Sequence, residues 1–308
     1  MATPLHPQEI FLLERYSSLE YFERMRDEFA MMVKVGDEAL AAFMTNLPPD
    51  YRSWPLFKQP DAVWGERILP NLHWTLAGLN DGFVQLTHGD FAGLGMAGNV
   101  TTAFNGIRRD YSTDWMSAAA QAQWTLHEDA CDMRSFNIDI TSHGDWTQGA
   151  LTARYHEVRG PLNVPPTWPV YRLNPAVRVR SGDKVLANGV YLPDADSSAA
   201  QFLVKDDEAW EADITTPESL KSPQRNSQPT TWTLVERIAN SGGGIPGASD
   251  PILAGVRMRC LAGQPCPQAG YWFTPARTNS RRSFRSGELM PEVGGDYGVT
   301  IWQWDEVQ

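Results

Sequence analysis

The run VRVRSG at residues 177–182, followed by NGVYLP at 188–193, returns in altered form roughly eighty residues later. The later copy reads VRMR at 256–259 and AG at 262–263, and then AGYWF at 269–273. Ser198 and Phe202 follow the first copy, as Ser280 and Phe284 follow the second. Self-similarity at a fixed period marks a structural unit that is used twice. We therefore expect two like units in the second half of the chain.

The composition of each copy predicts antiparallel β-structure. Short runs of β-branched and aromatic residues alternate with Gly, Pro, Asn and Asp, as strands alternate with turns. Each copy ends in such a run, TWTLV at 231–235 and TIWQW at 300–304. We assign residues 166–308 to a β-rich domain of two related small antiparallel units, at about 170–240 and 250–308.

The first 165 residues predict an all-helical domain. Apolar residues recur at steps of three and four from Leu12 to Met32, which gives a helix one apolar face. The proline-dense stretch GPLNVPPTWP at 160–169 cannot be helical and marks the boundary. The fold class is therefore predicted to be α+β, with domains at 1–165 and 166–308. The expected helices run over 7–46 with a break at Gly36, from about 60 with a restart at Pro70, over 90–108, from a cap at 112–114, and over 145–158.

Charge and cysteine content bound the compartment and the partners. The formal net charge is −11, of which residues 1–170 carry −9. Such a field repels nucleic acid and attracts basic partners, or serves solubility alone. We find no secretory signal, no apolar run near the ~20 residues of a membrane span, and an odd number of cysteines, three, in a long chain. We expect a cytoplasmic protein that binds neither nucleic acid nor membrane.

The residue types that carry catalysis are scattered along the chain. The six histidines lack metal-ligand spacing, and the pair Cys260 and Cys266 lacks the second pair that a zinc site needs. No P-loop, dinucleotide fingerprint, nucleophile elbow or zinc-protease motif is present. His127, Glu128 and Asp132 lie within reach of one another on one helix, but a charged helix face explains them better than a catalytic group does. We expect no enzyme activity, no catalytic residue, no metal and no cofactor.

Basic residues cluster at Arg277, Arg281, Arg282 and Arg285, with Phe284 among them. Such a cluster is compatible with RNA or phosphate binding. Because the whole chain is acidic, we expect these arginines to bind carboxylates of the helical domain or of a partner.

Several short strings carry a family resemblance. In the helical half they are QPDAVWG at 59–65 with LPN at 69–71, GD at 89–90 leading to AG at 97–98, and DYSTDWM at 110–116. These resemble bacterial immunity proteins of the polymorphic-toxin type, and the immunity protein 71 and immunity protein 72 families are the nearest. The strings GQPCPQAGYW at 263–272, SGELMP at 286–291 and WQWD at 302–305 resemble a module of proteins encoded near type VI secretion clusters.

The resemblance implies an immunity protein that binds a cognate secreted antibacterial toxin and neutralises it by stoichiometric protein–protein inhibition. Since we expect the protein in the cytoplasm, the toxin should act there. A toxin with a basic active-site cleft suits the acidic helical half, because complementary fields speed association. The alternative is an adaptor or chaperone that loads a type VI secretion effector without inhibiting it.

We expect the partner to bind mainly the helical half, at junctions between loops and helices. There, acidic residues lie beside large aromatic residues, which supply a charge for steering and an anchor for burial. The competing reading is that the carboxylates cap helices and the tryptophans fill the core. The candidate partner-binding residues are Asp61, Trp64, Glu66, Asp81, Asp90, Asp110, Asp114 and Trp115.

Overall fold

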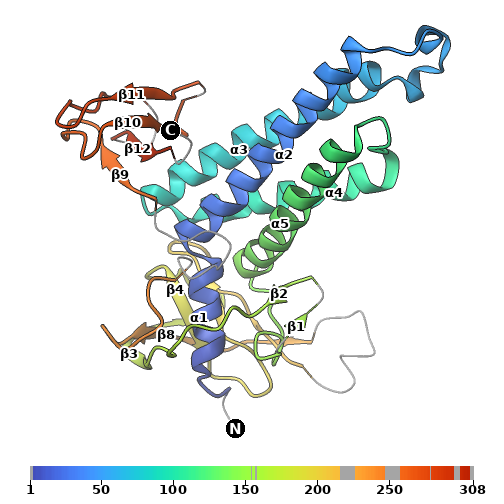
Figure 1. The fold of residues 1–308 in the computed structure, drawn as a ribbon. Coiled ribbons are helices and arrows are strands. Elements are labelled where there is room, and N and C mark those ends of the chain that lie inside the picture. Colours follow the sequence, from blue (N-terminus) through green and yellow to red (C-terminus); the bar gives the residue numbers. More distant parts are fainter. Residues whose placement is uncertain are drawn as a thin grey trace.

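The structure, a computed structural model, describes residues 3–153, 155–156, 158–215, 226–246, 257–277, 279–294 and 299–305 (Figure 1). Within these ranges every helix lies before residue 143 and every strand lies from residue 155 onwards. The strands form antiparallel sheets. The predicted α+β class is confirmed.

The helical part is built on long helices that pack side by side. Ser18 and Ser117 cap α2 and α5, because each hydroxyl accepts a bond from the backbone N–H three residues on, at 3.2 Å. The expected cap at 112–114 is therefore displaced to Ser117. The α-helices are α1 (Pro7–Tyr16), α2 (Leu19–Thr45), α3 (Leu69–Thr87), α4 (Ala97–Asp110) and α5 (Ala118–Ser142); shorter segments are the 3-10 turns η1 (Tyr51–Ser53), η2 (Leu56–Lys58) and η4 (Phe91–Met96), and the π-helix η3 (Asp61–Ile68).

Gly36 does not break the first long helix, contrary to the prediction. A Cβ atom at Gly36 would lie 2.8 Å from Leu69 Cδ2 and 2.9 Å from Trp124 Cζ3. The glycine thus allows α3 and α5 to approach α2 closely. The glycine serves helix packing, and α2 runs through it without interruption.

The helix predicted at 145–158 is also wrong. Gly144 and Gly149 adopt φ angles of 66° and 79°, in the left-handed region that ends helices. The chain instead makes turns and then the small ribbon of β1 (Tyr155–His156) and β2 (Gly160–Pro161). A Cβ at Gly144 would lie 2.2 Å from Trp210 of the β-rich part, so this turn is also a point of close contact.

Two four-stranded antiparallel units follow, and they share one topology. In each unit the last strand lies between the first and second strands, and the third strand lies at the edge (Figure 1). The predicted repeat is therefore confirmed. The first β unit consists of β3 (Tyr171–Arg180), β8 (Thr231–Arg237), β4 (Gly189–Pro193) and β5 (Gln201–Leu203); the second consists of β9 (Arg259–Leu261), β12 (Ile301–Trp304), β10 (Gly270–Phe273) and β11 (Arg282–Phe284), each in spatial order. A ribbon of β6 (Ala212–Asp213) and β7 (Ser227–Gln228) extends the first unit.

Register and core repeat as well. Gly189 pairs with Leu203 as Gly270 pairs with Phe284, and the turn hydrogen bond from Gly182 N–H to Ala209 O (2.8 Å) recurs from Gly263 N–H to Met290 O (2.7 Å). Each unit has a separate core in which equivalent positions are buried. The equivalent core positions are Val179 and Cys260, Val185 and Cys266, Tyr191 and Trp272, Leu203 and Phe284, Ala209 and Met290, and Trp232 and Trp302.

This register corrects the sequence alignment at both ends. Phe284 corresponds to Leu203 and not to Phe202, and Arg259, not Arg257, corresponds to Arg178. A one-residue slip moves a side chain to the other face of a sheet. Phe202 indeed belongs to the opposite face, which packs against the helices.

Candidate partner-binding surface

The two tryptophans predicted as anchors lie in the helical core or against it. Trp64 is 2% exposed and packs on Trp115 and Trp124, with ring centroids 5.4 and 5.3 Å apart. Trp115 is half-buried and also contacts Phe43. The expectation that Trp64 anchors a partner is corrected, because its ring is enclosed by its own helices.

Three of the predicted carboxylates have structural partners. Arg52 donates to Asp61 at 2.6 Å and the Tyr51 hydroxyl donates to it too. Burial alone would raise the pKa of Asp61, but these two hydrogen bonds and the charge of Arg52 lower it overall. Asp90 caps η4 by accepting from Ala92 N–H, and Asp110 pairs with its neighbour Arg109 at 2.7 Å. The capping reading thus holds for Asp90, and Asp61 closes the loop between α2 and η3.

The remaining carboxylates of the set are free for an external partner. Glu66, Asp81 and Asp114 are exposed, and within the described part of the chain no hydrogen bond or ion pair engages their side chains. Glu66 precedes Arg67 in η3, and Asp81 lies one helical turn beyond Gly78 in α3. Arg67 and Gly78, but not the three carboxylates, line a groove between α3 and α4.

The groove between α3 and α4 has small residues on its floor and a tryptophan on its rim. Trp74 is 78% exposed, a high value for the residue type with the largest apolar surface. Gly78, Ala103 and Gly106 are among the small residues that line the groove with it. The groove has a volume of about 680 Å³, within the usual range of ligand pockets. Its lining residues are Arg67, Ile68, Asn71, Trp74, Thr75, Gly78, Asn99, Thr102, Ala103, Gly106, Ile107 and Tyr111.

Trp74 was not predicted, although the sequence holds a signal for it. The buried residues of α3 follow one stripe: Leu69, Leu72, Leu79, Phe83 and Leu86. At 100° per residue, Trp74 falls almost opposite that stripe, on the face that should be polar. A tryptophan out of phase with the apolar periodicity indicates an exposed aromatic ring.

The acidity of α2 is largely used inside the molecule. Arg259 of the second β unit donates to Glu23 at 2.7 Å and lies 3.5 Å from Glu20, and Arg257 lies 2.8 Å from Asp27. Arg26, 2% exposed, bonds Asp27 and lies over the Phe83 ring at 4.3 Å. Three carboxylates of α2, Glu20, Glu23 and Asp27, therefore pair with arginines of the second β unit of the same chain.

Arg281 and Arg282 of the predicted cluster contact residues of the second unit itself. Arg281 pairs with Asp305 of its own unit and lies 3.9 Å from the centroid of Tyr271. Arg282 covers the rings of Phe284 and Trp302 at 4.7 and 4.9 Å. Among the described residues, Arg257 and Arg259, which stand earlier in the second copy, bind carboxylates of α2, and Arg237 of the first unit pairs with Glu14 of α1 at 3.4 Å.

The helix residues that suggested catalysis form a structural network. Arg108 donates to Glu128 at 2.7 Å and to Asp132 at 2.6 Å, and Trp124 Nε1 donates to Glu128 at 2.9 Å. The pKa of Glu128 is raised overall, because the effect of burial exceeds the lowering by Arg108. His127 pairs instead with Glu28 of α2 at 2.7 Å. The network ties α4 and α2 to α5.

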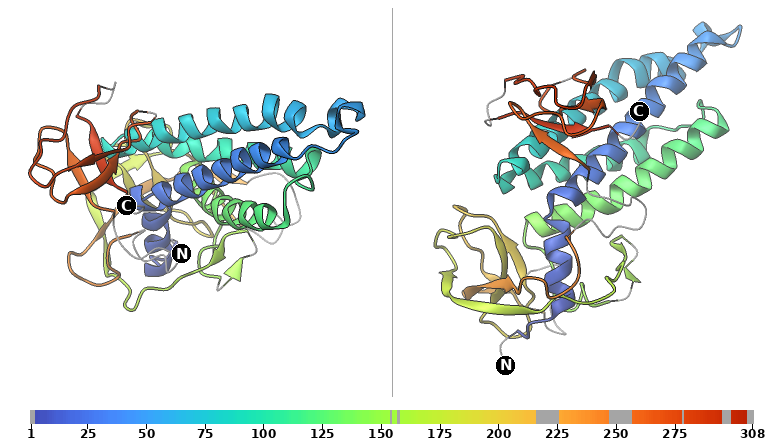
Figure 2. Two further views of the ribbon diagram at one scale, coloured as in Figure 1. Left: turned by 45° about the horizontal axis from the view of Figure 1, so that its top comes forward. Right: turned by 60° about the vertical axis from the view of Figure 1, so that its left-hand side comes forward.

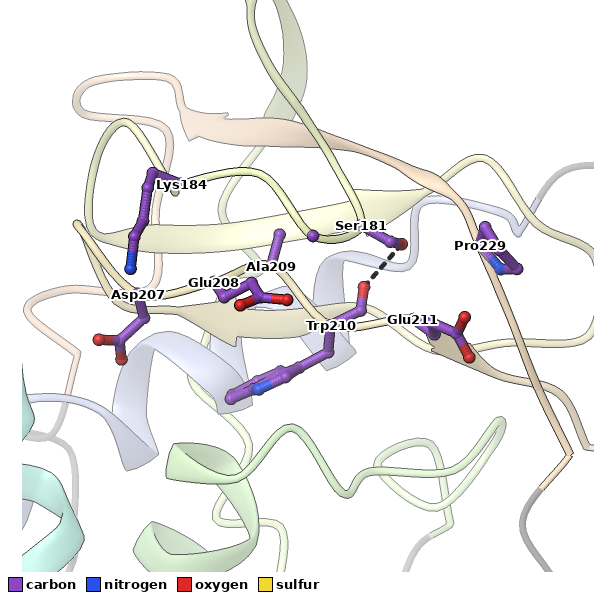
Figure 3. A pocket seen from close by; sticks show the side chains of 9 residues that line it. Ser181, Lys184, Asp207, Glu208, Ala209, Trp210, Glu211 and Pro229 are labelled. Carbon is purple, nitrogen blue, oxygen red and sulfur yellow. Dashed lines mark hydrogen bonds between the residues drawn. The ribbon is translucent and has the colours of Figure 1, made fainter.

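A second hollow lies on the first β unit, between two turns (Figure 3). Lys184, Asp207, Glu208 and Glu211 line it, and the carbonyl of Trp210 accepts from Ser181 Oγ at 2.9 Å. Lys184 and Glu208 face each other across a bridge that recurs in the second unit as Pro265 and Leu289. The repeated scaffold therefore does not require these charges, and the hollow contains none of the predicted site residues.

Comparison of the chain with protein-family models, with curated proteins and with solved structures finds no match. No helix among the described residues is both long enough and apolar enough to span a membrane. Likewise, no three His, Cys, Asp or Glu side chains of the described part gather where a metal ion could be held.

Proposed function

We propose that this protein is a stoichiometric inhibitor of an antibacterial toxin and binds the toxin through the groove between α3 and α4. The observation that carries the proposal is Trp74, 78% exposed on the rim of that groove. Tryptophan is the residue type most enriched among interface hot spots, and its exposure in the free protein leaves apolar surface that a partner can bury. The resemblance to immunity proteins supplies the class of partner.

The free carboxylates around the groove support a basic partner. Glu66 precedes the groove-lining Arg67, and Asp81 lies one helical turn beyond the groove-lining Gly78; no hydrogen bond or ion pair among the described residues engages either carboxylate. Asp114 lies near η3, because its neighbour Trp115 packs on Trp64. Charges at an interface rim chiefly steer association and lose this effect as salt rises. We therefore expect the two kinds of residue to act differently: the carboxylates on the association rate, and Trp74 on the dissociation rate.

The test takes the products of the genes adjacent to the one for this protein as candidate toxins and produces each in a heterologous bacterial host with or without this protein. We expect the wild-type protein to restore growth and to abolish the toxin's activity in vitro at one molecule per molecule. Trp74→Ser should weaken binding about 30-fold or more, as loss of a hot spot does. Leu289→Ser is the matched control, because Leu289 is 66% exposed but belongs to the second β unit.

The outcomes separate inhibition from delivery. A complex in which the toxin keeps its full activity would contradict inhibition and identify an adaptor. Equal binding by the Trp74 and Leu289 variants would contradict the groove as the binding surface, whatever the toxin's activity in the complex.

A further inference from the structure

A cleft of about 600 Å³ lies where the second β unit meets the helices, beside α2 and α3 (Figure 2). The helices contribute Met31 of α2, Leu76 of α3 and His127 of α5 to its lining. The second unit contributes Phe273 at the end of β10 and Arg277 in the loop that follows. The volume is within the range of small-ligand pockets, and such pockets often lie where two parts of a protein meet.

The described carboxylates that line the cleft each have a partner that lines it too. The pairs are Asp27 with Arg26 and Arg257 at 2.6 and 2.8 Å, Glu28 with His127 at 2.7 Å, and Asp305 with Arg281 at 2.5 Å. Glu23, which is not part of the lining, bonds Arg259 at 2.7 Å and lies 3.5 Å from Arg257. An engaged carboxylate repels an incoming anion less than a free one does, because the charge of its partner offsets its own.

Positive charge exceeds negative charge along the cleft. Among the described residues that line it, five are Lys or Arg and three are Asp or Glu. Arg277 is exposed, and no ion pair or hydrogen bond in the described part of the chain engages its guanidinium. Lys34 is also open to a ligand, because its pair with Glu38 spans 3.9 Å and the two side chains are 63% and 68% exposed. Although the whole chain is acidic, the cleft therefore favours an anion.

Apolar side chains make up much of the remaining wall. They are Ala30, Met31, Leu76, Phe273 and Pro275, and Met31 is 43% exposed. An inorganic anion would leave this surface in water, whereas a ligand with an apolar part would remove it from water. A guanidinium pairs in planar, bidentate geometry with carboxylate and phosphate groups alike. The two kinds of surface together fit a small organic anion.

An acidic side chain of a partner protein is the competing occupant. One such side chain fills only part of a cleft of about 600 Å³ and leaves most of the apolar wall in water. A small organic anion places its charged group and its apolar part in the cleft at the same time. The shape and the composition of the cleft thus favour the small ligand.

We propose that the cleft binds a small organic anion, whose carboxylate or phosphate contacts Arg277 and whose apolar part lies against Met31 and Phe273. The cleft shares no lining residue with the α3–α4 groove, so this site does not depend on the proposed function. Because the helices and the second unit both line the cleft, a bound ligand should stabilise their contact.

The experiment titrates the purified full-length protein by nuclear magnetic resonance with phenyl phosphate and with benzoate, which separate a phosphate ligand from a carboxylate ligand. Inorganic phosphate supplies the charge alone, and benzyl alcohol supplies the apolar ring alone. We expect at least one of the two organic anions to bind at one molecule per chain, about 10-fold more tightly than either control compound. The same anion should slow amide exchange in both α2 and β10.

Two variants test the two parts of the site. Arg277→Gln should weaken binding of the organic anion about 10-fold, because the charged contact is lost. Its matched control is Arg285→Gln, which removes the same charge from an exposed residue of the second unit that does not line the cleft. Met31→Ser should weaken binding of the organic anion about 5-fold and leave that of inorganic phosphate unchanged. Thermal unfolding checks that each variant is folded.

Each result supports or contradicts the site. Weaker binding by Arg277→Gln with an unchanged Arg285→Gln supports it. Equal loss in both variants would mean general attraction to basic residues and would overturn it, as would inorganic phosphate that binds as tightly as phenyl phosphate. If neither organic anion binds at millimolar concentration, the proposal is wrong. Binding of a tetraglutamate peptide in that case would assign the cleft to an acidic protein segment.

Discussion

The two β units share a scaffold and differ in the face that they turn toward the helices. In the first unit that face carries Val190, Leu192, Phe202 and Val235, which belong to the same core as the helices. The equivalent residues of the second unit are Tyr271, Phe273, Ser283 and Asp305, and the core of this unit is separate. Figure 2 shows the second unit as a body apart from the first, beside α2 and α3. The first unit shares a core with the helices, whereas the second unit is attached to the outside of the helical part.

The second unit is attached to the helices by ion pairs with α2 and by an apolar contact in which Phe83 and Val84 of α3 lie close to Pro275 and Ile301. Arg257 and Arg259 meet Glu20, Glu23 and Asp27, and the pair between Arg259 and Glu23 is 20% and 6% exposed at its side chains. Apolar burial is non-directional, while a partly buried ion pair depends on geometry and on both partners. Each copy of an internal repeat can thus keep its own core, while only the first copy also shares a core with the helices.

The largest effect should come from the tryptophan that is equivalent in the two units. Trp232→Ala and Trp302→Ala each remove a ring that is 1% exposed, at a cost of about 3–5 kcal/mol. We expect Trp232→Ala to lower the amide-exchange protection of α1 and α5 together with the first unit. Trp302→Ala should lower protection in the second unit alone.

Hydrogen exchange with mass spectrometry measures both responses. Phe57→Ser, which changes an exposed residue of η2, serves as the control that should change neither region. Loss of protection throughout the molecule in Trp302→Ala would show that the second unit is integrated as tightly as the first.

The ionic attachment should give the next largest effect. Arg259→Ala leaves Glu23 buried without this partner, which should cost about 3 kcal/mol and increase exchange along the first half of α2. The exposed pair between Arg172 and Glu236 in the first unit, at 3.1 Å, is the matched control. Double-mutant cycles should give a coupling below about 1 kcal/mol for that exposed pair. A coupling no larger for Arg259 and Glu23 would contradict the ionic attachment.

The repeat could be predicted from sequence because it rests on local signals. Glycines at turns and tryptophans in strands recur at similar spacing, and Gly182 and Gly263 adopt φ angles of 88° and 80°. The residue-by-residue alignment of the two copies could not be predicted from the sequence. Phe202 and Leu203 are both apolar, and only the pairing with Gly189 decides which one faces the core of the unit. The helix predicted at 145–158 failed for a similar reason, because nothing in its periodicity reveals the contact between Gly144 and Trp210.

The candidate site was only partly predictable. Exposed carboxylates such as Glu66 and Asp81 follow from helix position, but the burial of Trp64 and the exposure of Trp74 depend on which elements pack together. Trp64 lies against Trp115 and Trp124, which come from elsewhere in the chain. The internal use of the acidic face of α2 was hidden as well, because Arg259 is more than 200 residues away.

The two cysteines of the second unit should be nearly neutral to replacement. Cys260 and Cys266 occupy the positions of Val179 and Val185, so Cys260→Val and Cys266→Val should change the free energy of unfolding by less than about 1.5 kcal/mol. Cys131 is the contrasting case, because it is fully buried between α2 and α5 and its thiol contacts Met25 O. Cys131→Val should cost about 1–3 kcal/mol through overpacking. Chemical denaturation compares the three, and equal costs would refute the assignment of equivalent positions.

The smallest effect concerns Glu292, which closes the last loop of the second unit. Its carboxylate accepts from the Thr300 hydroxyl and N–H and from the N–H groups of Val293 and Gly294. The side-chain and backbone hydrogen bonds of Thr300 lower its pKa below the ordinary value of 4.5. The equivalent residue of the first unit, Glu211, accepts from Ser227 at 2.6 Å.

Because the folded-state pKa of Glu292 is lowered, its contribution to stability is present above pH 4.5 and is lost as pH falls through the lower folded value. Glu292→Gln should therefore reduce the amide-exchange protection of β12 at pH 6. The difference in protection between the variant and the wild type should become smaller as the pH falls below 4.5. Since the carboxylate is exposed, the effect should be modest and confined to the second unit. Glu211→Gln, measured on β8 over the same pH range, is the matched comparison. A pH-independent difference for Glu292→Gln would mean that the loop depends on the shape of this side chain and not on its charge.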